Sequence, residues 1–281
     1  MQLRKGKATY YVLLDLINIV NKYTSELVGF TSFNTVMTNM SDNTFKVLKN
    51  PSKKHPARVR VLMTEFVTHD VKRFIVEKPK GYEFLPGQAT LLSIPKPKWE
   101  EEFREFSFTS MNQDQVLEFT VKAYPDHNGF TKQIHTLEPG DELTVHAPFG
   151  TIQYRGKGVF LAGGAGITPF IAILRHLNKT NQLKGNTLIF SNKEAKDIIL
   201  EKEFRQMLGE DLILTLTRDD TKGYEHGRIN KDLLKRHVKD LNQKFYICGP
   251  DPFVINLKKT LESMGVKEED IVAESFIVAD A

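Results

Sequence analysis

The sequence predicts a chain of two unlike domains, a small antiparallel β-barrel followed by a doubly wound α/β domain with a parallel sheet. Between residues 57 and 154, short runs of alternating apolar and polar residues are separated by turns rich in glycine and proline, a pattern typical of a small antiparallel barrel. From residue 155 to residue 281, strand-like runs alternate with helix-like runs, which favours a parallel sheet covered by helices on both faces. Residues 1–56 precede both domains as an extension.

The composition excludes several classes of protein. Apolar residues make up 40% and charged residues 26% of the chain, as in globular proteins and unlike disordered or membrane-spanning chains. The longest apolar run, residues 10–20, contains Asp15 and Asn18 and is too short to cross a bilayer. No signal-peptide cleavage site follows it. We therefore expect a cytoplasmic protein with no membrane partner.

The single cysteine, Cys248, and eight scattered histidines limit the redox and metal chemistry of the chain. One cysteine forms no intramolecular disulfide and holds no four-thiolate iron–sulfur cluster. The histidines do not share a helix face with a carboxylate at metal-ligand spacing, so we expect no metal site. The net charge of +4 is mild. It suits an acidic protein partner or simply solubility, and we expect no nucleic-acid partner.

The extension, residues 1–56, carries no recognisable chemistry. Apolar side chains recur in it at helical spacing, which predicts a short amphipathic helix. These side chains are Tyr10, Leu13, Leu14, Ile17 and Val20. Residues 50–56 then have the composition of a linker. Two interpretations stay open for the extension: a packing cap or tail, and an oligomer or partner contact.

The barrel strands are predicted where apolar side chains recur at every second position. The inward-facing sets are Val59, Val61 and Met63; Phe74 and Val76; Leu117, Phe119 and Val121; and Leu143 and Val145. Turns are expected at Pro86-Gly87, at residues 126–129 and at residues 139–141, each of which contains glycine. A helix-like segment, Thr131–Leu137, interrupts the strands.

The second domain is predicted to contain five strands and four helices in alternation. The strands are residues 159–162, 187–190, 212–217, 245–248 and 271–273. The helices are residues 169–177, 196–208, 231–238 and 252–263. Thr168 and Asp251 each precede a proline, and we expect each of them to cap the helix that follows.

Three short segments carry chemistry. Gly163-Gly164-Ala165-Gly166 follows a strand and opens a helix, where glycines let the backbone turn tightly and approach a pyrophosphate. Cys248-Gly249-Pro250 follows the fourth strand, at the edge where such sheets bind ligands. Arg104-Glu105-Phe106-Ser107 lies in the barrel. Taken singly, each also fits a plain structural interpretation: a glycine turn without a ligand, a buried cysteine, and a strand with a core phenylalanine.

Together, in this order, the three segments resemble the ferredoxin–NADP reductase superfamily of flavoproteins. Three further segments agree with that family: Phe84-Leu85-Pro86-Gly87-Gln88, residues 121–131, and Glu274-Ser275-Phe276. The resemblance implies an FAD-binding barrel over residues 57–154 and an NAD(P)-binding domain over residues 155–281. It also implies that hydride passes from NADH or NADPH to bound FAD, and that single electrons then pass to a separate soluble carrier such as flavodoxin or ferredoxin.

The resemblance implies a flavin site on the barrel. Arg104 would pair with the flavin diphosphate, Phe106 would lie against the isoalloxazine ring, and the Ser107 hydroxyl would bond to the redox-active nitrogen N5. A second phosphate segment would be formed by Val121, Tyr124, Gly129, Phe130 and Thr131. In relatives an aromatic ring near the C-terminus covers the other flavin face, and Phe276 occupies that place here.

The resemblance also implies a nicotinamide site on the second domain. Its binding residues would be Gly163, Gly164, Gly166, Thr168, Pro169, Gly249 and Pro250. Cys248 would lie beside the nicotinamide ring with an orienting role, and Glu274 would add a charge or hydrogen bond near the site of transfer. With Ser107, these two residues are the expected catalytic set.

The choice of nucleotide and of acceptor stays open in the sequence. Ser191 and Lys193 fall where the adenosine ribose is expected, and a lysine there suits a 2′-phosphate. The same segment, together with residues 197–200, looks like the NADH-using cytochrome b5 reductase branch, and this resemblance slightly favours NADH. For the acceptor, the alternatives are a reductase component of an oxygenase, a reductase of free flavin, and a non-catalytic flavin- or nucleotide-sensing module.

Overall fold

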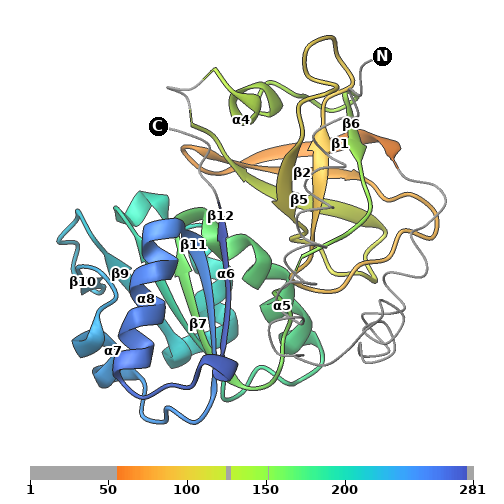
Figure 1. Cartoon of the computed structure of the whole chain (residues 1–281). Helices are drawn as coiled ribbons and strands as arrows, with labels where there is room; N and C mark the ends of the chain where they lie inside the picture. Colours follow the sequence, from red (N-terminus) through yellow and green to blue (C-terminus); the bar gives the residue numbers. More distant parts are fainter. Residues whose placement is uncertain (1–55, 125–127, 151, 277–281) are drawn as a thin grey trace, which may run out of the picture.

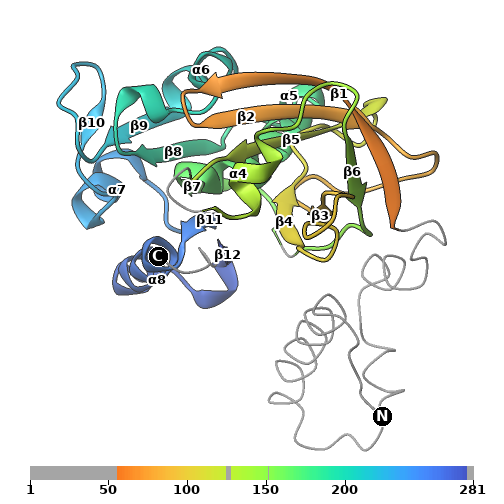
Figure 2. The ribbon, with the colours of Figure 1, turned by 90° about the horizontal axis from the view of Figure 1, so that it is seen from above.

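The computed structural model describes residues 56–124, 128–150 and 152–276, and these form two sheets in separate lobes (Figures 1 and 2). The predicted amphipathic helix and linker of the extension, residues 1–55, lie outside the described residues. Within the described part of the chain, no helix has both the length and the apolar character needed to cross a membrane.

The first lobe is a closed antiparallel barrel. Its strands are β1 (Ala57–Thr68), β2 (Val71–Glu77), β3 (Ala89–Ser93), β4 (Arg104–Ser107), β5 (Val116–Lys122) and β6 (Glu142–Val145), with the short helix α4 (Phe130–Ile134) before β6. The sheet runs in the order β4-β3-β6-β1-β2-β5. Its two edges meet where Phe108 bridges Phe119 and where the Thr109 amide donates to the Glu118 carbonyl at 2.9 Å. That contact joins the two edge strands and closes the sheet.

The apolar positions predicted to face the barrel interior are buried except at one position of β1. Val59 and Val61 are buried, as are Phe74 and Val76 on β2. The prediction that Met63 faces inward is wrong, because Met63 is 41% exposed. The pairing of β1 with β2 shifts register between Val61 and Met63, and one extra residue in a strand turns the following side chains to the opposite face.

The second lobe contains a parallel sheet in the order β10-β9-β8-β7-β11-β12. Its strands are β7 (Gly158–Gly163), β8 (Thr187–Asn192), β9 (Leu212–Leu216), β10 (Glu225–His226), β11 (Lys244–Pro250) and β12 (Ile271–Phe276). The strand order reverses between β7 and β11, which pair side by side in parallel. A reversal of this kind opens a crevice at the carboxyl ends of the two strands, where doubly wound sheets bind ligands.

Helices cover both faces of the parallel sheet, as predicted. On one face lie α5 (Thr168–Lys179) and α6 (Glu201–Leu208), whose Phe170 and Phe204 pack with Phe160 and Phe190 of the sheet. On the other face lie α7 (Lys231–His237) and α8 (Asp251–Ser263), packed over Leu161 and Ile247. Figure 1 shows α5 beside the sheet, on the side nearer the barrel. Val71 of the barrel strand β2 belongs to the same core as α5.

Two local predictions for the second lobe are wrong. The segment predicted as one helix, residues 196–208, is a 3₁₀ turn, η2 (Ala195–Asp197), followed by α6, with Leu200 at φ 54° between them. A left-handed residue interrupts a right-handed helix. Thr168 and Asp251 are also not caps. The 3₁₀ turn η1 (Gly164–Ile167) runs directly into α5, and β11 runs directly into α8, so both residues are already helical.

Candidate functional site

The two glycine segments of the second domain meet at the crevice between β7 and β11. A Cβ atom placed on Gly166 would lie 2.2 Å from the Cys248 carbonyl oxygen, far inside any real contact. A Cβ atom on Gly249 would lie 3.4 Å from the Gly163 Cα atom and 2.8 Å from the Phe253 ring. The backbones therefore touch directly, and only glycine allows this approach. Gly164 in the same turn adopts a left-handed conformation, with φ +53°, which glycine tolerates best.

The glycine turn leads into the start of α5. Thr168 is buried, and its hydroxyl donates to the Ala165 carbonyl at 3.0 Å. The hydroxyl thus fixes the shape of the turn. Pro169 follows within the first helical turn, and no side chain caps the helix. The amides at the start of α5 and the helix dipole are directed toward the crevice, an arrangement that favours an anionic ligand such as a pyrophosphate.

Cys248 and Glu274 lie side by side across β11 and β12. They are partners in the parallel register, so both fall at the carboxyl edge of the sheet. Cys248 is fully buried. Burial raises the pKa of its thiol well above the ordinary value, and the nearby Glu274 charge raises it further. Because only a thiolate is a good nucleophile, the neutral thiol is suited to packing and not to covalent chemistry.

The end of β8 adds a polar group that the sequence reasoning did not assign. Asn192 is 5% exposed, and neither its amide nitrogen nor its amide oxygen has a hydrogen-bond partner among the described residues. Buried amides are nearly always paired. Ser191 beside it is half-buried and pairs with Gly163 in the sheet, whereas Lys193 is exposed. The unpaired Asn192 amide can therefore form hydrogen bonds with a polar ligand at this edge of the sheet.

On the barrel, the end of β4 holds the other predicted site residues. The Arg104 guanidinium is half-exposed and donates to Glu102 at 3.3 Å and to the Phe103 carbonyl at 2.8 Å. Phe106 is partly buried against the barrel core. Ser107 is 6% exposed, and its hydroxyl has no hydrogen-bond partner within the described ranges. A cation, a ring and a free hydroxyl thus follow one another along four residues.

The second flavin segment runs from β5 into α4. Val121 is buried in the barrel and Tyr124 is 36% exposed. Gly129 precedes α4 without offering a capping side chain, and Thr131 lies in the first turn of that helix. Phe130 is buried with its ring 6.0 Å from that of Phe106. This ring contact links the β4 and α4 segments. The predicted cover, Phe276, ends β12 opposite Pro250 in register, and its side chain lies outside the described part of the structure.

Comparisons with known proteins bear on both lobes. A family model described as an oxidoreductase FAD-binding domain matches residues 58–154, and one described as an oxidoreductase NAD-binding domain matches residues 160–259. The chain is 32% identical to the NADH-cytochrome b5 reductase 1 of Aspergillus terreus, over 71% of this chain and 74% of that protein. It is 29% identical to the reductase component of propane 2-monooxygenase of Rhodococcus jostii, over 78% of this chain and 63% of that component.

Solved structures show the same fold. A ferredoxin NADP⁺ reductase from Neisseria gonorrhoeae with bound FAD and NADP superposes with a TM-score of 0.69 at 20% identity, covering 78% of this chain and 98% of that one. The FAD/NAD-binding domain of a nitric oxide dioxygenase from Vibrio cholerae gives 0.71 at 21% identity, covering 79% and 98%.

The chain belongs to the ferredoxin–NADP reductase superfamily. It is a flavoprotein oxidoreductase with an FAD-binding barrel and an NAD(P)-binding domain, as the sequence predicted. When bound, the flavin supplies the capacity to accept a hydride and to release electrons one at a time.

The residues of this reductase fit both cofactors. The contact at Gly166 and the orphaned amide of Asn192 leave a polar cradle at the nucleotide edge. On the barrel, the Ser107 hydroxyl and the half-exposed guanidinium of Arg104 offer polar groups to the flavin. One residue that joins the two lobes was missed altogether. Arg175 lies in mid-helix on α5, and no local motif distinguishes it from an ordinary surface arginine.

We predict that Arg104→Ala weakens flavin retention. The present partner of Arg104, Glu102, is nearly half-exposed, and exposed pairs contribute little, so the guanidinium is available to a diphosphate. Charge-assisted hydrogen bonds contribute about 1.5–3 kcal/mol each, which predicts a rise in the FAD dissociation constant of about tenfold or more. Equilibrium dialysis of the apoprotein with FAD measures this change. Arg60→Ala, an exposed arginine of β1, is the control, and an unchanged constant for Arg104→Ala contradicts the assignment.

We predict that Ser107→Ala slows flavin reduction without loss of flavin. The hydroxyl makes no hydrogen bond to another described residue, so we expect its removal to act mainly on a bound ligand. Loss of a hydrogen bond of about 1–1.5 kcal/mol lowers the rate constant by roughly tenfold. Stopped-flow reduction at saturating nucleotide measures this rate constant, and Ser107→Thr, which retains a hydroxyl, should recover part of it. Equal rate constants in Ser107→Ala and the unaltered protein would show that Ser107 is only structural.

Proposed function

We propose that this reductase oxidises NADH or NADPH at the crevice between β7 and β11 and delivers electrons singly to a separate carrier protein such as a flavodoxin or ferredoxin. The single observation that carries the proposal is the convergence at one sheet edge of the Gly166 turn, Cys248 and Glu274. A neutral buried thiol and a half-buried carboxylate surround that edge, and no nucleophile is needed for hydride transfer.

In this proposal each group acts by binding and orienting. The glycine turn and the start of α5 hold the nucleotide diphosphate, which leaves the nicotinamide end toward Cys248 and Glu274. Arg104 and the start of α4 hold the flavin diphosphate, which leaves Ser107 beside the ring. Fixing two reactants in this manner supplies much of the rate enhancement without any acid or base from the protein.

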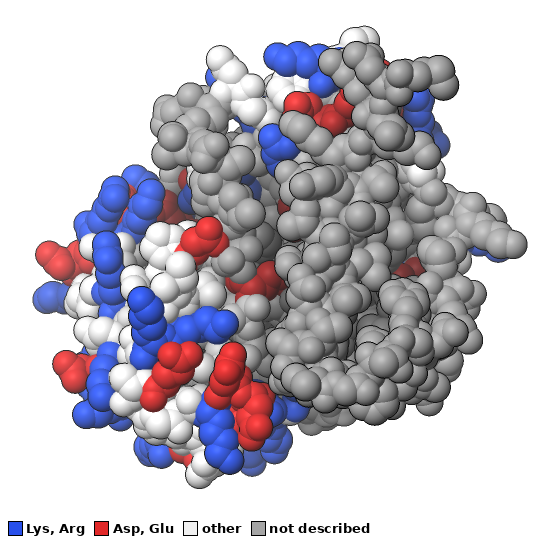
Figure 3. Space-filling model, in the orientation of Figure 1, with Lys and Arg blue, Asp and Glu red and all other residues white. Residues whose placement is uncertain are grey.

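Two observations support a separate carrier as the acceptor. The chain has one cysteine, which is too few for a four-cysteine iron–sulfur cluster of its own. Relatives are named as cytochrome b5 reductases and as a ferredoxin–NAD(P)⁺ reductase component of a naphthalene dioxygenase system. A reductase component of an oxygenase is therefore the second candidate. On the face seen in Figure 3, basic and acidic side chains are interspersed around α7 and α8, so the described residues there offer no single-sign field to steer a charged partner.

Anaerobic titration of the purified protein with NADH, and separately with NADPH, tests the proposal. We expect a yellow protein whose flavin absorbance bleaches with about one equivalent of nucleotide and recovers when an oxidised carrier is added. A colourless protein that takes up no added FAD would contradict flavin binding. A yellow protein that neither nucleotide bleaches would instead indicate the sensing module.

We infer that NADPH is accepted, because cations gather where the adenosine ribose is expected. Lys193 and Arg218 are exposed at the ends of β8 and β9, and the Arg218 amide donates to the Lys193 carbonyl at 2.9 Å. The neighbouring acids are engaged. Glu194 is in a capping box and pairs with Lys196 at 2.6 Å, and Asp219 accepts from the Ala195 amide at 3.1 Å and from the Thr221 hydroxyl at 2.6 Å. Free cations suit a 2′-phosphate, whereas a free acid suits the 2′-hydroxyl.

We predict that the double variant Lys193→Gln with Arg218→Gln lowers kcat/KM for NADPH by about tenfold or more, since each lost charge-assisted bond contributes about 1.5–3 kcal/mol. The value for NADH should change by no more than about twofold, because NADH lacks the phosphate. Steady-state reduction of ferricyanide with each nucleotide measures the ratio. Lys202→Gln, an exposed lysine of α6, is the control, and equal losses for both nucleotides would contradict the inference.

A further inference from the structure

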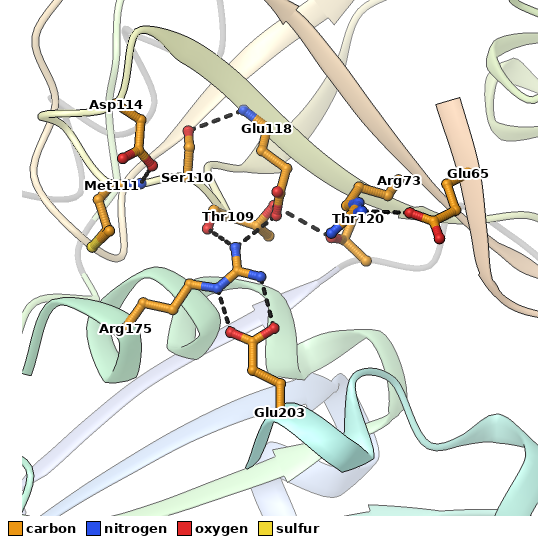
Figure 4. Close-up of polar contacts among 10 residues, drawn as sticks. All are labelled: Glu65, Arg73, Thr109, Ser110, Met111, Asp114, Glu118, Thr120, Arg175 and Glu203. Atoms are coloured by element: carbon orange, nitrogen blue, oxygen red, sulfur yellow. Dashed lines mark hydrogen bonds and ion pairs between the residues drawn. The ribbon is translucent and has the colours of Figure 1, made fainter. Parts of the chain in front are cut away.

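Helix α5 is the element that touches the functional segments of both lobes. It begins at Thr168, directly after the glycine turn. Further along, Ile173 contacts the barrel turn at Gly87, where an added Cβ atom would lie 2.9 Å from the Ile173 side chain. Two residues later, Arg175 reaches into the barrel (Figure 4). The same helix therefore starts at the nucleotide edge and ends its first two turns against the flavin domain.

Arg175 forms a fork between three acceptors (Figure 4). Its Nη1 donates to the Thr109 carbonyl at 2.8 Å and to Glu118 Oε1 at 2.7 Å, both in the barrel. Its Nε and Nη2 donate to the two carboxylate oxygens of Glu203 on α6, at 2.6 and 2.9 Å. The side chain is 17% exposed. Burial opposes its charge, but Glu203 and Glu118 outweigh burial and raise the pKa of Arg175 above its ordinary value, so the residue stays cationic.

The barrel side of this contact is itself held by hydrogen bonds. The Thr109 amide donates to the Glu118 carbonyl at 2.9 Å, and the Thr109 hydroxyl donates to Glu118 Oε1 at 2.8 Å. The Glu118 amide in turn donates to the Ser110 hydroxyl at 3.0 Å. A carboxylate held from several sides has little freedom to follow a moving partner. Arg175 is therefore bound to barrel groups that are themselves hydrogen-bonded to one another.

The residues of this contact are close in sequence to the expected sites of both cofactors. Thr109 lies two residues after Ser107, the residue expected at the flavin. Thr168 lies seven residues before Arg175, a separation of about 10 Å along a helix. A continuous path thus runs from the glycine turn through α5 and Arg175 to Thr109 and the end of β4.

We propose that Arg175 is a positioning residue for hydride transfer, which sets the nicotinamide edge against the flavin strand and contacts neither cofactor. This proposal rests on the proposed function of the same site. An arginine suits the task because its planar fork binds both carboxylates and a carbonyl at once, which an ammonium group does not do. Without it, Glu118 and Glu203 would face each other as like charges and the Thr109 carbonyl would lose its donor from α5.

The experiment compares Arg175→Met, Arg175→Lys and the control Arg205→Met, which removes an exposed ion pair of α6. We expect Arg175→Met to bind FAD and NADP⁺ within about threefold of the unaltered protein, by dialysis and calorimetric titration, because the contacts to each cofactor remain. The rate constant of flavin reduction at saturating nucleotide should fall by about tenfold or more, since misplaced reactants lose the advantage of proximity. The long-wavelength charge-transfer absorbance on mixing should weaken in parallel, with Arg175→Lys intermediate.

A purely structural role predicts a different result. Arg175→Met would then lower the melting temperature while the saturated rate constant and the charge-transfer absorbance stay at the level of Arg205→Met, and that outcome overturns the proposal. Arg175→Lys decides between the two roles if the methionine variant does not fold.

If the unaltered protein is reduced by neither nucleotide, the proposed function fails, and scanning calorimetry still tests the contact between the lobes. We expect Arg175→Met to unfold in two separated domain transitions, and a single transition at the unaltered temperature overturns the positioning role.

Discussion

The direct contact of two backbones at the carboxyl ends of β7 and β11 is the constraint on which the site depends. At Gly166 no side chain fits, because the Cys248 carbonyl occupies the place of a Cβ atom. This approach fixes where α5 begins and where β11 ends. It also fixes Glu274, which is in register with Cys248 on the neighbouring strand. Two glycine segments separated by more than eighty residues therefore define one edge.

The barrel is attached to that edge by polar contacts and a small apolar contribution. Val71 and the Gly87 turn pack against α5 or its core. Arg175 forms one polar link to the barrel, and His69 of the barrel lies 3.8 Å from Asp197 of the second lobe. Contacts of this type hold two domains in a defined orientation, yet they bury much less apolar surface than a domain core does. The relative placement of the lobes thus depends on a few named residues, which makes it sensitive to single substitutions.

The local features of this chain were open to prediction because they depend on neighbours in sequence. Alternation identified the buried faces of β2 and β5, and glycine after a strand identified the turn at Gly166. The failures have non-local causes. Met63 is exposed because the pairing of β1 with β2 shifts register before it. Leu200 interrupts a helix-like run because it is itself left-handed, and no pattern in the sequence indicates this. Arg175 was missed for the same reason, since its partners lie 57 and 66 positions away in sequence.

The expected site carries its cations at exposed positions and several neutral polar groups at buried ones. The cations expected to hold phosphates, Arg104, Lys193 and Arg218, are half-exposed or exposed, where an ionised group keeps much of its hydration. The groups at the centre, Ser107, Cys248 and Asn192, are buried and uncharged. Burying a charge without a partner is far more costly than burying a neutral dipole. In the proposed site the cofactors are bound by their charged ends, and the rings lie near the neutral Ser107 and Cys248 and the half-buried carboxylate of Glu274. Alignment of the rings, and not a reactive side chain, is then the protein's contribution.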